Sequence, residues 1–329
     1  KVASSMQGMG TASSSGTSYV MPALGYVRRN GALTWGVGVF SQGGMGTDYG
    51  ADTFLAMGSG QPVRSELGVG RLLFPLSFQV SPELAVGGSI DYVWATLDMR
   101  MAASGAQLGG LVTGAGGNLA MALPALGGAP WARLDFSDSN DFSGAAKSSG
   151  WAGKLGLTYR PMAALTLGAS YQLKTSLKDM KTGASGATLS AMGGFADSGR
   201  VTVVDFQWPE TWALGLAWQA TPALLLAGDV KRIGWSKVMK DFKLRYDSAG
   251  MGGSVSFALP QNWDDQTVLS LGAAWDLGPL TLRAGYNHAS SPIPAAYVHP
   301  LFPATVENHY TAGLGWRLSP GSELNLALT

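Results

Sequence analysis

The sequence predicts an all-β protein, an antiparallel transmembrane β-barrel, on three observations. Charged residues make up 13% of the 329-residue chain, about half their usual share in a soluble domain. Long segments alternate large apolar residues with small or charged ones, which is the period of a β-strand. Very short turns and long connections also alternate along the chain, and this asymmetry is typical of outer-membrane barrels.

Composition excludes several other classes of protein. The net charge is +1 and the Lys and Arg residues are not clustered, so no nucleic-acid partner is expected. The chain has no cysteine, which removes disulfide scaffolds and thiolate metal sites. The longest uncharged stretch, residues 101–132, holds eight glycines and two prolines. Because these residues cost a helix about 1 and 3 kcal/mol each, we expect an adaptable loop with at most short helical pieces there, and no transmembrane helix.

The alternation is longest in residues 164–178. Leu165 and Leu167 lie on one face of this segment, and Thr166 and Lys174 lie on the other. A strand of about 14 residues is much longer than the usual five or six. The same phase recurs in twelve segments, each with large apolar residues opposite small or charged ones. In chain order they are residues 19–29, 33–42, 67–80, 84–99, 151–160, 164–178, 211–219, 224–235, 267–277, 280–288, 309–318 and 322–328.

Tight turns join these segments in pairs. Asn30 and Gly31 separate the first two segments, and this dipeptide accepts the positive φ of a type I′ hairpin turn. The later turns each contain a proline and lie at residues 81–83, 160–163, 221–222, 278–279 and 319–321. The connections between the pairs are long, at residues 43–66, 100–150, 179–210, 236–266 and 289–308. In an outer-membrane barrel the short turns are periplasmic and the long loops are extracellular.

The apolar face of these segments has two possible environments, the core of a soluble β-sandwich or the lipid around a barrel. Ten residues tilted near 45° span about 23 Å, close to the ~25 Å apolar band of membrane barrels. Aromatic residues sit toward strand ends, as at Trp212 and Trp218. Turning Lys174 toward lipid would cost about 2 to 4 kcal/mol at the midplane. The phase therefore places the charges in the lumen and the apolar face on lipid.

Glycine and proline positions add local detail to the barrel. The 47 glycines suit bulges and crowded lumen positions. Pro75 lies within a predicted strand and has no N–H to donate to the ladder. We therefore expect a local break at Pro75.

Four stretches of the sequence are similar to one protein family. They are residues 35–49 (WGVGVFSQGGMGTDY), 69–97, 229–242 (DVKRIGWSKVMKDF) and 300–310 (PLFPATVENHY). These stretches resemble the FadL-type long-chain fatty acid transporters of the outer membrane, a family that includes aromatic-hydrocarbon uptake channels. The likeness extends over essentially the whole chain, and the order of long and short connections agrees.

The resemblance implies a 14-stranded barrel whose lumen is closed by an N-terminal plug, or hatch. It also implies that a hydrophobic ligand binds between two long extracellular loops, passes to a deeper pocket and leaves sideways into the bilayer beside a kinked strand. Twelve segments without a hatch or a closing strand point to a fragment, a single incomplete barrel domain over residues 1–329 that works as a monomer. Two of its edges would be left unpaired in lipid.

By this resemblance, two long loops form the groove that captures the ligand. Their apolar residues need burial in any case, so the alternative is that they pack on one another. The candidates are Leu108, Leu111, Val112, Leu119, Met121, Leu123, Leu126 and Trp131 in the first loop, and Leu189, Met192 and Phe195 in the second.

A lateral gate is expected at Gln42, Gly43 and Gly44. They end the segment that corresponds to the kinked strand of the family, and adjacent glycines suit a break in a ladder. The alternative is an ordinary exit from strand to loop.

A fatty acid carboxylate would need a cation that has no protein partner and lies in an apolar pocket. Lys174, Lys231 and Arg283 are candidates on the inward face. Asp229 and Glu323 can pair with some of these cations, so the sequence does not select one.

The leading hypothesis is passive transport of long-chain fatty acids or other hydrophobic compounds, such as aromatic hydrocarbons, into the lipid of a Gram-negative outer membrane. We expect no enzyme activity, cofactor or metal, because no catalytic grouping is visible and His288, His299 and His309 lack metal-ligand spacing. A general diffusion porin would instead carry opposed charge clusters in a constriction loop. An outer-membrane enzyme or adhesin would need a catalytic cluster or a charged binding loop.

Overall fold

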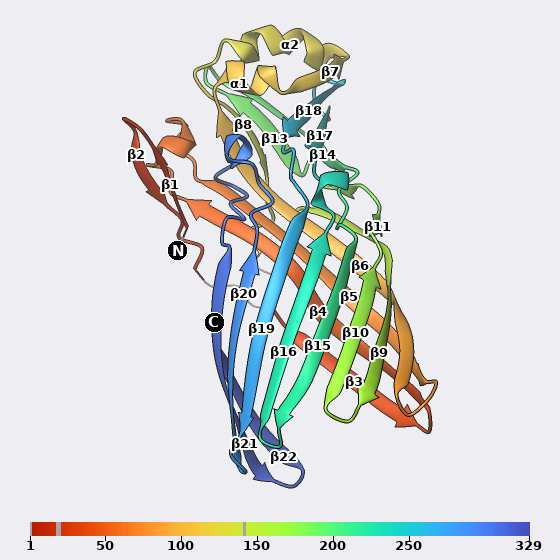
Figure 1. Cartoon of the computed structure of the whole chain (residues 1–329). Helices are drawn as coiled ribbons and strands as arrows, with labels where there is room; N and C mark the ends of the chain where they lie inside the picture. Colours follow the sequence, from red (N-terminus) through yellow and green to blue (C-terminus); the bar gives the residue numbers. More distant parts are fainter. Residues whose placement is uncertain (1, 18–20, 141–142) are drawn as a thin grey trace.

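The wall of the molecule is a β-barrel of antiparallel strands, which confirms the predicted fold class. The computed structural model describes residues 2–17, 21–140 and 143–329. Twelve described strands follow one another around the wall in chain order (Figure 1). They are β3 (Ala23–Asn30), β4 (Leu33–Tyr49), β5 (Val63–Gln79), β6 (Leu84–Ala103), β9 (Ala146–Met162), β10 (Leu165–Gln172), β15 (Thr211–Thr221), β16 (Leu224–Ile233), β19 (Gln266–Asp276), β20 (Leu280–Ala289), β21 (Asn308–Ser319) and β22 (Ser322–Leu328).

Each predicted segment corresponds to one of these strands, but several ends differ. Strand β4 continues to Tyr49, whereas the prediction stopped at residue 42. Conversely, β10 ends at Gln172, and residues 176–177 form the separate short strand β11 (Ser176–Leu177). The ends of a strand depend on where its pairing with neighbouring strands stops, and the alternation of side chains in the sequence does not show where that is. The expected start of the first segment at residue 19 lies outside the described residues.

The large apolar side chains lie on the outer face, as predicted. Tyr92 and Trp151 are paired across β6 and β9, both are exposed, and their rings lie 5.5 Å apart at a steep angle. The opposite face carries Ser170 on β10, Ala213 on β15 and Lys231 on β16, which lie side by side across these strands. Small side chains and charges therefore line the lumen, and leucine, tryptophan and tyrosine face outward.

The circular strand order closes between β22 and β3, where the sequence predicted two unpaired edges. The eleven other neighbouring pairs of the wall each have a defined ladder. Among the described residues, no register joins β22 to β3, and every residue of both strands is exposed. This seam is therefore the most weakly packed part of the wall.

Pro75 interrupts the sheet on one side only. Toward β6 the ladder is continuous and Pro75 lies opposite Ser89. Toward β4 the pairing passes from Leu76 opposite Trp35 to Leu73 opposite Gly38, without a pair at Phe74 or Pro75. The proline, which has no N–H, removes a rung on the β4 side, so the expected break is present there without ending the strand.

The long connections form a folded layer over one end of the barrel (Figure 1). Residues 101–132 contain two short helices, α1 (Gly105–Gly110) and α2 (Asn118–Gly127), as the sequence allowed. Neither helix is long and apolar enough to cross a bilayer, and the same holds for every described helix. The remaining elements are β1 (Ala3–Met6), β2 (Gly10–Ser13), β7 (Val112–Gly116), β8 (Ala132–Phe136), β12 (Met180–Lys181), β13 (Ala187–Ala191), β14 (Phe195–Val204), β17 (Asp241–Ser248), β18 (Ser254–Pro260), η1 (Phe54–Ala56), η2 (Trp235–Lys237) and η3 (Ala295–Tyr297).

A buried arginine ties this layer together. The Arg133 guanidinium on β8 donates to both carboxylate oxygens of Asp135, at 2.8 and 3.0 Å, and to Ser59 Oγ at 2.8 Å. It also donates to the carbonyl oxygens of Gln61 and Pro62. One side chain thus fixes the connection between β4 and β5 to the connection between β6 and β9. The layer is an ordered core, and its apolar residues are accordingly packed.

Candidate functional site

The predicted gate residues form a β-bulge in the middle of a strand. Ser41 of β4 lies opposite Gly70 of β5, and Gly43 lies opposite Val69, the residue next to Gly70. Gln42 is therefore an extra residue in β4, the defining feature of a bulge. Because β4 continues beyond it, the alternative of an ordinary strand exit is wrong. The gate role itself is a proposal taken up below.

An ion pair between the two neighbouring strands lies on the inner face and holds the bulge in place. Arg71 on β5 donates through Nε to Gln42 Oε1. Its Nη1 donates to Asp91 Oδ2 on β6 at 2.7 Å. Both charged side chains are nearly inaccessible, with 5% and 2% of their surface exposed. One guanidinium therefore joins β4, β5 and β6 at the height of the bulge.

A tryptophan from another part of the barrel covers the bulge. A Cβ atom built on Gly43 would lie 2.9 Å from Cη2 of Trp208, so only glycine leaves room for the indole in this position. Trp208 lies in the connection between β14 and β15. In the wall, β5, β6, β9 and β10 separate β15 from β4, so the indole reaches across the mouth of the lumen. Gly43 pairs with the buried Val69, which places this contact on the inner face.

Trp208 is the first ring of an aromatic cluster formed by Trp208, Trp235 and Trp263. The centroids of the first two rings lie 5.3 Å apart and those of the last two 5.0 Å apart, both edge to face. Such contacts are worth about 0.5 to 1.5 kcal/mol beyond the area they bury. Trp208 comes from the long connection between β10 and β15, and Trp235 and Trp263 both come from the long connection between β16 and β19. Trp263 is buried, and Trp208 and Trp235 pack against the same core.

The core beside this cluster is apolar, and the ion pairs Lys237–Glu210 and Arg232–Asp265 lie next to the cluster in the chain. Phe242 and Phe302 lie in ring contact with centroids 5.7 Å apart, and Leu301 is buried beside them in the same core. His299 contacts Phe302, and its Nδ1 accepts a hydrogen bond from the backbone N–H of Leu301 at 3.2 Å. Burial lowers the pKa of His299 because it disfavours the imidazolium. The packed core of the mouth therefore offers apolar contacts to a ligand.

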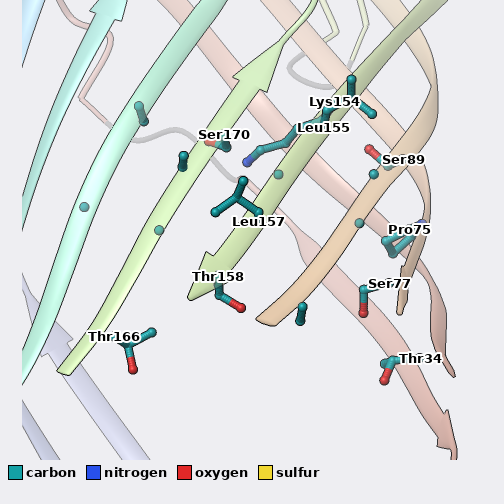
Figure 2. Close-up of a pocket in the computed structure, with 18 of the residues that line it drawn as sticks. Thr34, Pro75, Ser77, Ser89, Lys154, Leu155, Leu157, Thr158, Thr166 and Ser170 are labelled. Carbon is teal, nitrogen blue, oxygen red and sulfur yellow. The ribbon is translucent and has the colours of Figure 1, made fainter. Parts of the chain in front are cut away.

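Below the mouth, the lumen wall borders an open cavity of about 730 Å³. Its lining is dominated by Gly, Ala, Ser and Thr, together with Lys154 and Asp229. Figure 2 shows Thr34, Ser77 and Ser170 on separate strands around this space. A second cavity of about 560 Å³ is lined mainly by glycine and alanine of the later strands and includes Arg283. The small side chains are what make the lumen wide.

The two loops predicted to bind ligand do meet. Strand β8 of the first loop pairs with β13 of the second, and the Met192 N–H donates to the carbonyl oxygen of Trp131. Most of their predicted residues are packed rather than available on a surface. Leu108, Leu119, Leu126 and Leu189 are buried, Leu111, Val112, Leu123 and Phe195 are partly buried against the same core, Trp131 is half-buried, and Met121 and Met192 are exposed. None of these eleven residues lines the 730 Å³ cavity.

The predicted carboxylate partners are dispersed in the structure. Arg283 donates to Asn325 Oδ1 at 2.7 Å and pairs with Glu323 at 3.4 Å. Arg283 therefore has protein partners, whereas a carboxylate site was expected to need a cation without one. Lys231 lies on the inner face opposite Ala213 and Val268. No ion pair of Lys174 or Lys231 is among the described interactions, and both side chains are exposed.

Sequence reasoning missed Arg71 and the aromatic cluster. Arg71 is the single charged residue between Glu66 and Glu83, and this isolation in an apolar strand was the available signal. The three tryptophans carry no comparable signal because Trp208 lies in a different connection from Trp235 and Trp263. The described residues contain no group of three His, Cys, Asp or Glu side chains that could hold a metal ion.

Comparison with known proteins gives a consistent result. The model of the family described as outer membrane protein transport protein (OMPP1/FadL/TodX) matches residues 2–329. The chain is similar to the P. putida toluene transporter TodX, at 34% identity over 96% of this chain and 77% of that one, with a TM-score of 0.83. The Ralstonia pickettii toluene transporter TbuX is 30% identical over 98% and 77%, with a TM-score of 0.79. A Pseudomonas aeruginosa FadL homologue, at 18% identity over 93% and 68% with a TM-score of 0.69, shares the fold. No curated protein sequence matches the chain.

Replacing Asp91 with Asn should destabilise the barrel, because Arg71 would remain buried without its counter-charge. Breaking a buried pair in this way costs about 3 to 5 kcal/mol. Reversible urea unfolding of the refolded barrel in detergent measures the loss. Asp229→Asn is the matched control, since Asp229 is exposed on the lumen wall and no ion pair of it is described. Equal stability of the two variants would show that the pair does not hold the bulge.

Proposed function

Since the chain belongs to the OMPP1/FadL/TodX family of outer-membrane transport proteins, we propose that it takes neutral hydrophobic molecules through the mouth of its lumen and releases them sideways into the bilayer at the β4 bulge. The family consists of transport channels for hydrophobic compounds in the Gram-negative outer membrane and not of enzymes. The proposal concerns the route and the kind of ligand. We take the described chain as one barrel domain that works as a monomer, with outer-membrane lipid as the receiving phase.

The bulge at Gln42 is the observation that carries the route. A regular ladder seals the wall, whereas a bulge leaves one residue outside the pairing and bends the strand. On the inner side of this bulge, Val69 lies opposite Gly43 and the Trp208 indole packs against Gly43, next to the Arg71–Asp91 ion pair. An apolar ligand that leaves through the wall enters hydrocarbon directly, so it avoids about 0.8 kcal/mol of hydration cost per CH₂ group.

Charge pairing near the route favours a neutral hydrocarbon over a fatty acid. The buried cation beside the bulge, Arg71, is compensated by Asp91. A carboxylate placed there would compete with Asp91 and would leave buried charge uncompensated. Lys231 and Lys154, which have no ion pair among the described interactions, lie on the wall of the wide lumen and not in an enclosed apolar pocket.

The aromatic cluster supports a ligand that contains a ring. A planar aromatic molecule can make edge-to-face contacts with Trp208 and Trp235 of the kind that these residues already make with one another. Two of the similar proteins, TodX and TbuX, are toluene transporters. We therefore propose an aromatic hydrocarbon as the ligand class, in preference to a long-chain fatty acid.

For the first capture step, we propose the exposed methionines of the two paired loops. Met121 and Met192 are the two exposed members of the predicted set, at 74% and 55% of their surface. Methionine side chains are flexible and polarisable, so they adapt to apolar ligands of different shape. The buried leucines of these loops support the layer and take no direct part in capture.

The proposed function predicts selective uptake. Cells of a Gram-negative strain that lacks its own hydrophobic channel, with intact lipopolysaccharide, should take up labelled toluene faster when they express this protein. Labelled arabinose uptake should stay at the background rate because the apolar core of the mouth does not replace the hydrogen bonds that the sugar hydroxyl groups make with water. Labelled palmitate in the same cells tests the preference for a neutral ligand. Arabinose entering as fast as toluene would instead identify a diffusion porin.

Changing Met121 and Met192 together to Asp should slow toluene uptake at low external concentration, where capture limits the rate. The loss should be roughly tenfold, which corresponds to about 1.4 kcal/mol of lost apolar contact. Met9→Asp is the matched control, because Met9 is an exposed methionine outside the two loops. Unchanged uptake in the double variant would remove the methionines from the capture step.

A further inference from the structure

The inner face of the bulge is closed in the structure by one side chain. The Trp208 indole lies so close to Gly43 that a single added carbon would collide with the ring. We propose that Trp208 is the gating residue of the lateral route and that its ring must leave Gly43 before a ligand can pass. This inference rests on the proposed function, since it assumes that the ligand leaves at the bulge.

The backbone of Trp208 is anchored while its ring is not. The backbone N–H of Trp208 donates to Thr175 Oγ1 at 2.7 Å, and its carbonyl oxygen accepts from the Thr175 N–H at 3.0 Å. The side-chain amide of Gln207, the preceding residue, accepts from the Leu177 N–H through Oε1 and donates to the Leu177 carbonyl oxygen through Nε2, both at 2.9 Å. These bonds hold the connection next to β11. A movement of Trp208 is therefore a rotation of its side chain.

The three indoles of the aromatic cluster differ in how they are held. The Trp235 N–H donates to Gln266 Oε1 at 3.3 Å, and the Trp263 N–H donates to Gln261 Oε1 at 3.2 Å. No hydrogen bond of the Trp208 indole is among those described. Trp208 is held by ring contacts, and a rotation leaves no polar group of the described network without its partner. Of the three rings, it is the one free to turn.

The opposite side of the gate is rigid. Gln42 is held by Arg71, which is itself fixed to Asp91. The bulge therefore keeps its shape when the ring moves, and opening requires no breakage of the ladder in lipid. An aromatic ligand that reaches the cluster can take over the edge-to-face contact with Trp235 that Trp208 gives up. The ligand thereby offsets the cost of opening.

Trp208→Ala tests the gate in the uptake assay with labelled toluene. The variant should raise the uptake rate roughly two- to tenfold, the factor expected for the loss of one aromatic contact. Heat modifiability in gel electrophoresis reports whether the barrel is folded. An unchanged or lower rate in the folded variant would overturn the gate. Failure of the wild-type protein to take up toluene faster than arabinose would instead overturn the proposed function.

A second pair of variants keeps the test decisive if Trp208→Ala acts through packing alone. Adding Gly43→Phe to Trp208→Ala supplies a ring from the β4 side and should return the rate toward that of the wild type. Adding Gly272→Phe is the matched control, since a Cβ atom there meets no atom closer than 3.9 Å on the β19 wall. This control should keep the raised rate. Equal rates in the two double variants would contradict closure at Gly43.

Discussion

Within the bilayer every backbone N–H and C=O group must be paired inside the protein, because lipid offers no partner. Eleven of the twelve neighbouring strand pairs of the wall meet this requirement with continuous or nearly continuous ladders, and the seam between β22 and β3 has no ladder among the described residues. Side chains on such strands alternate between lipid and lumen. The low charge of the chain, its apolar outer face and its small lumen residues all follow from that pairing. A route through the wall must therefore use a local exception to the ladder.

Side chains on the lumen face hold the bulge at Gln42 in place. A buried ion pair is seldom a net gain in stability, and here its clearest structural effect is to hold the extra residue of β4 against β5 and β6. From the other side, Trp208 fills the space that glycine leaves at position 43. In the proposed gate, Arg71 and Asp91 stay fixed and the Trp208 ring turns, so the wall opens without loss of backbone pairing. The apolar core of the mouth above it offers contacts to a hydrophobic ligand.

The sequence predicted the barrel well because the period of two depends only on local alternation. It placed all twelve strands and their inward phase, but it ended β4 too early because glycines 43 and 44 carry no side chain to mark the face. It could not tell buried residues from exposed ones in the long loops: Leu119 and Met121 are both apolar, yet Leu119 is buried and Met121 is exposed. The Trp208 contact with Gly43 joins residues 165 positions apart, and no local pattern encodes such a contact.

The central claim is that hydrophobic ligands leave through the irregular part of β4, and deleting Gln42 tests it most directly. At present Ser41 lies opposite Gly70 and Gly43 lies opposite Val69, with Gln42 as the extra residue between them. The deletion would join these two pairs in one continuous register. Every other side chain of β4 would stay on its present face. The measurement is the toluene uptake rate of cells that carry a folded barrel with this deletion. We predict a rate equal to that of cells without the channel. Uptake at the wild-type rate through the regularised wall would contradict the account.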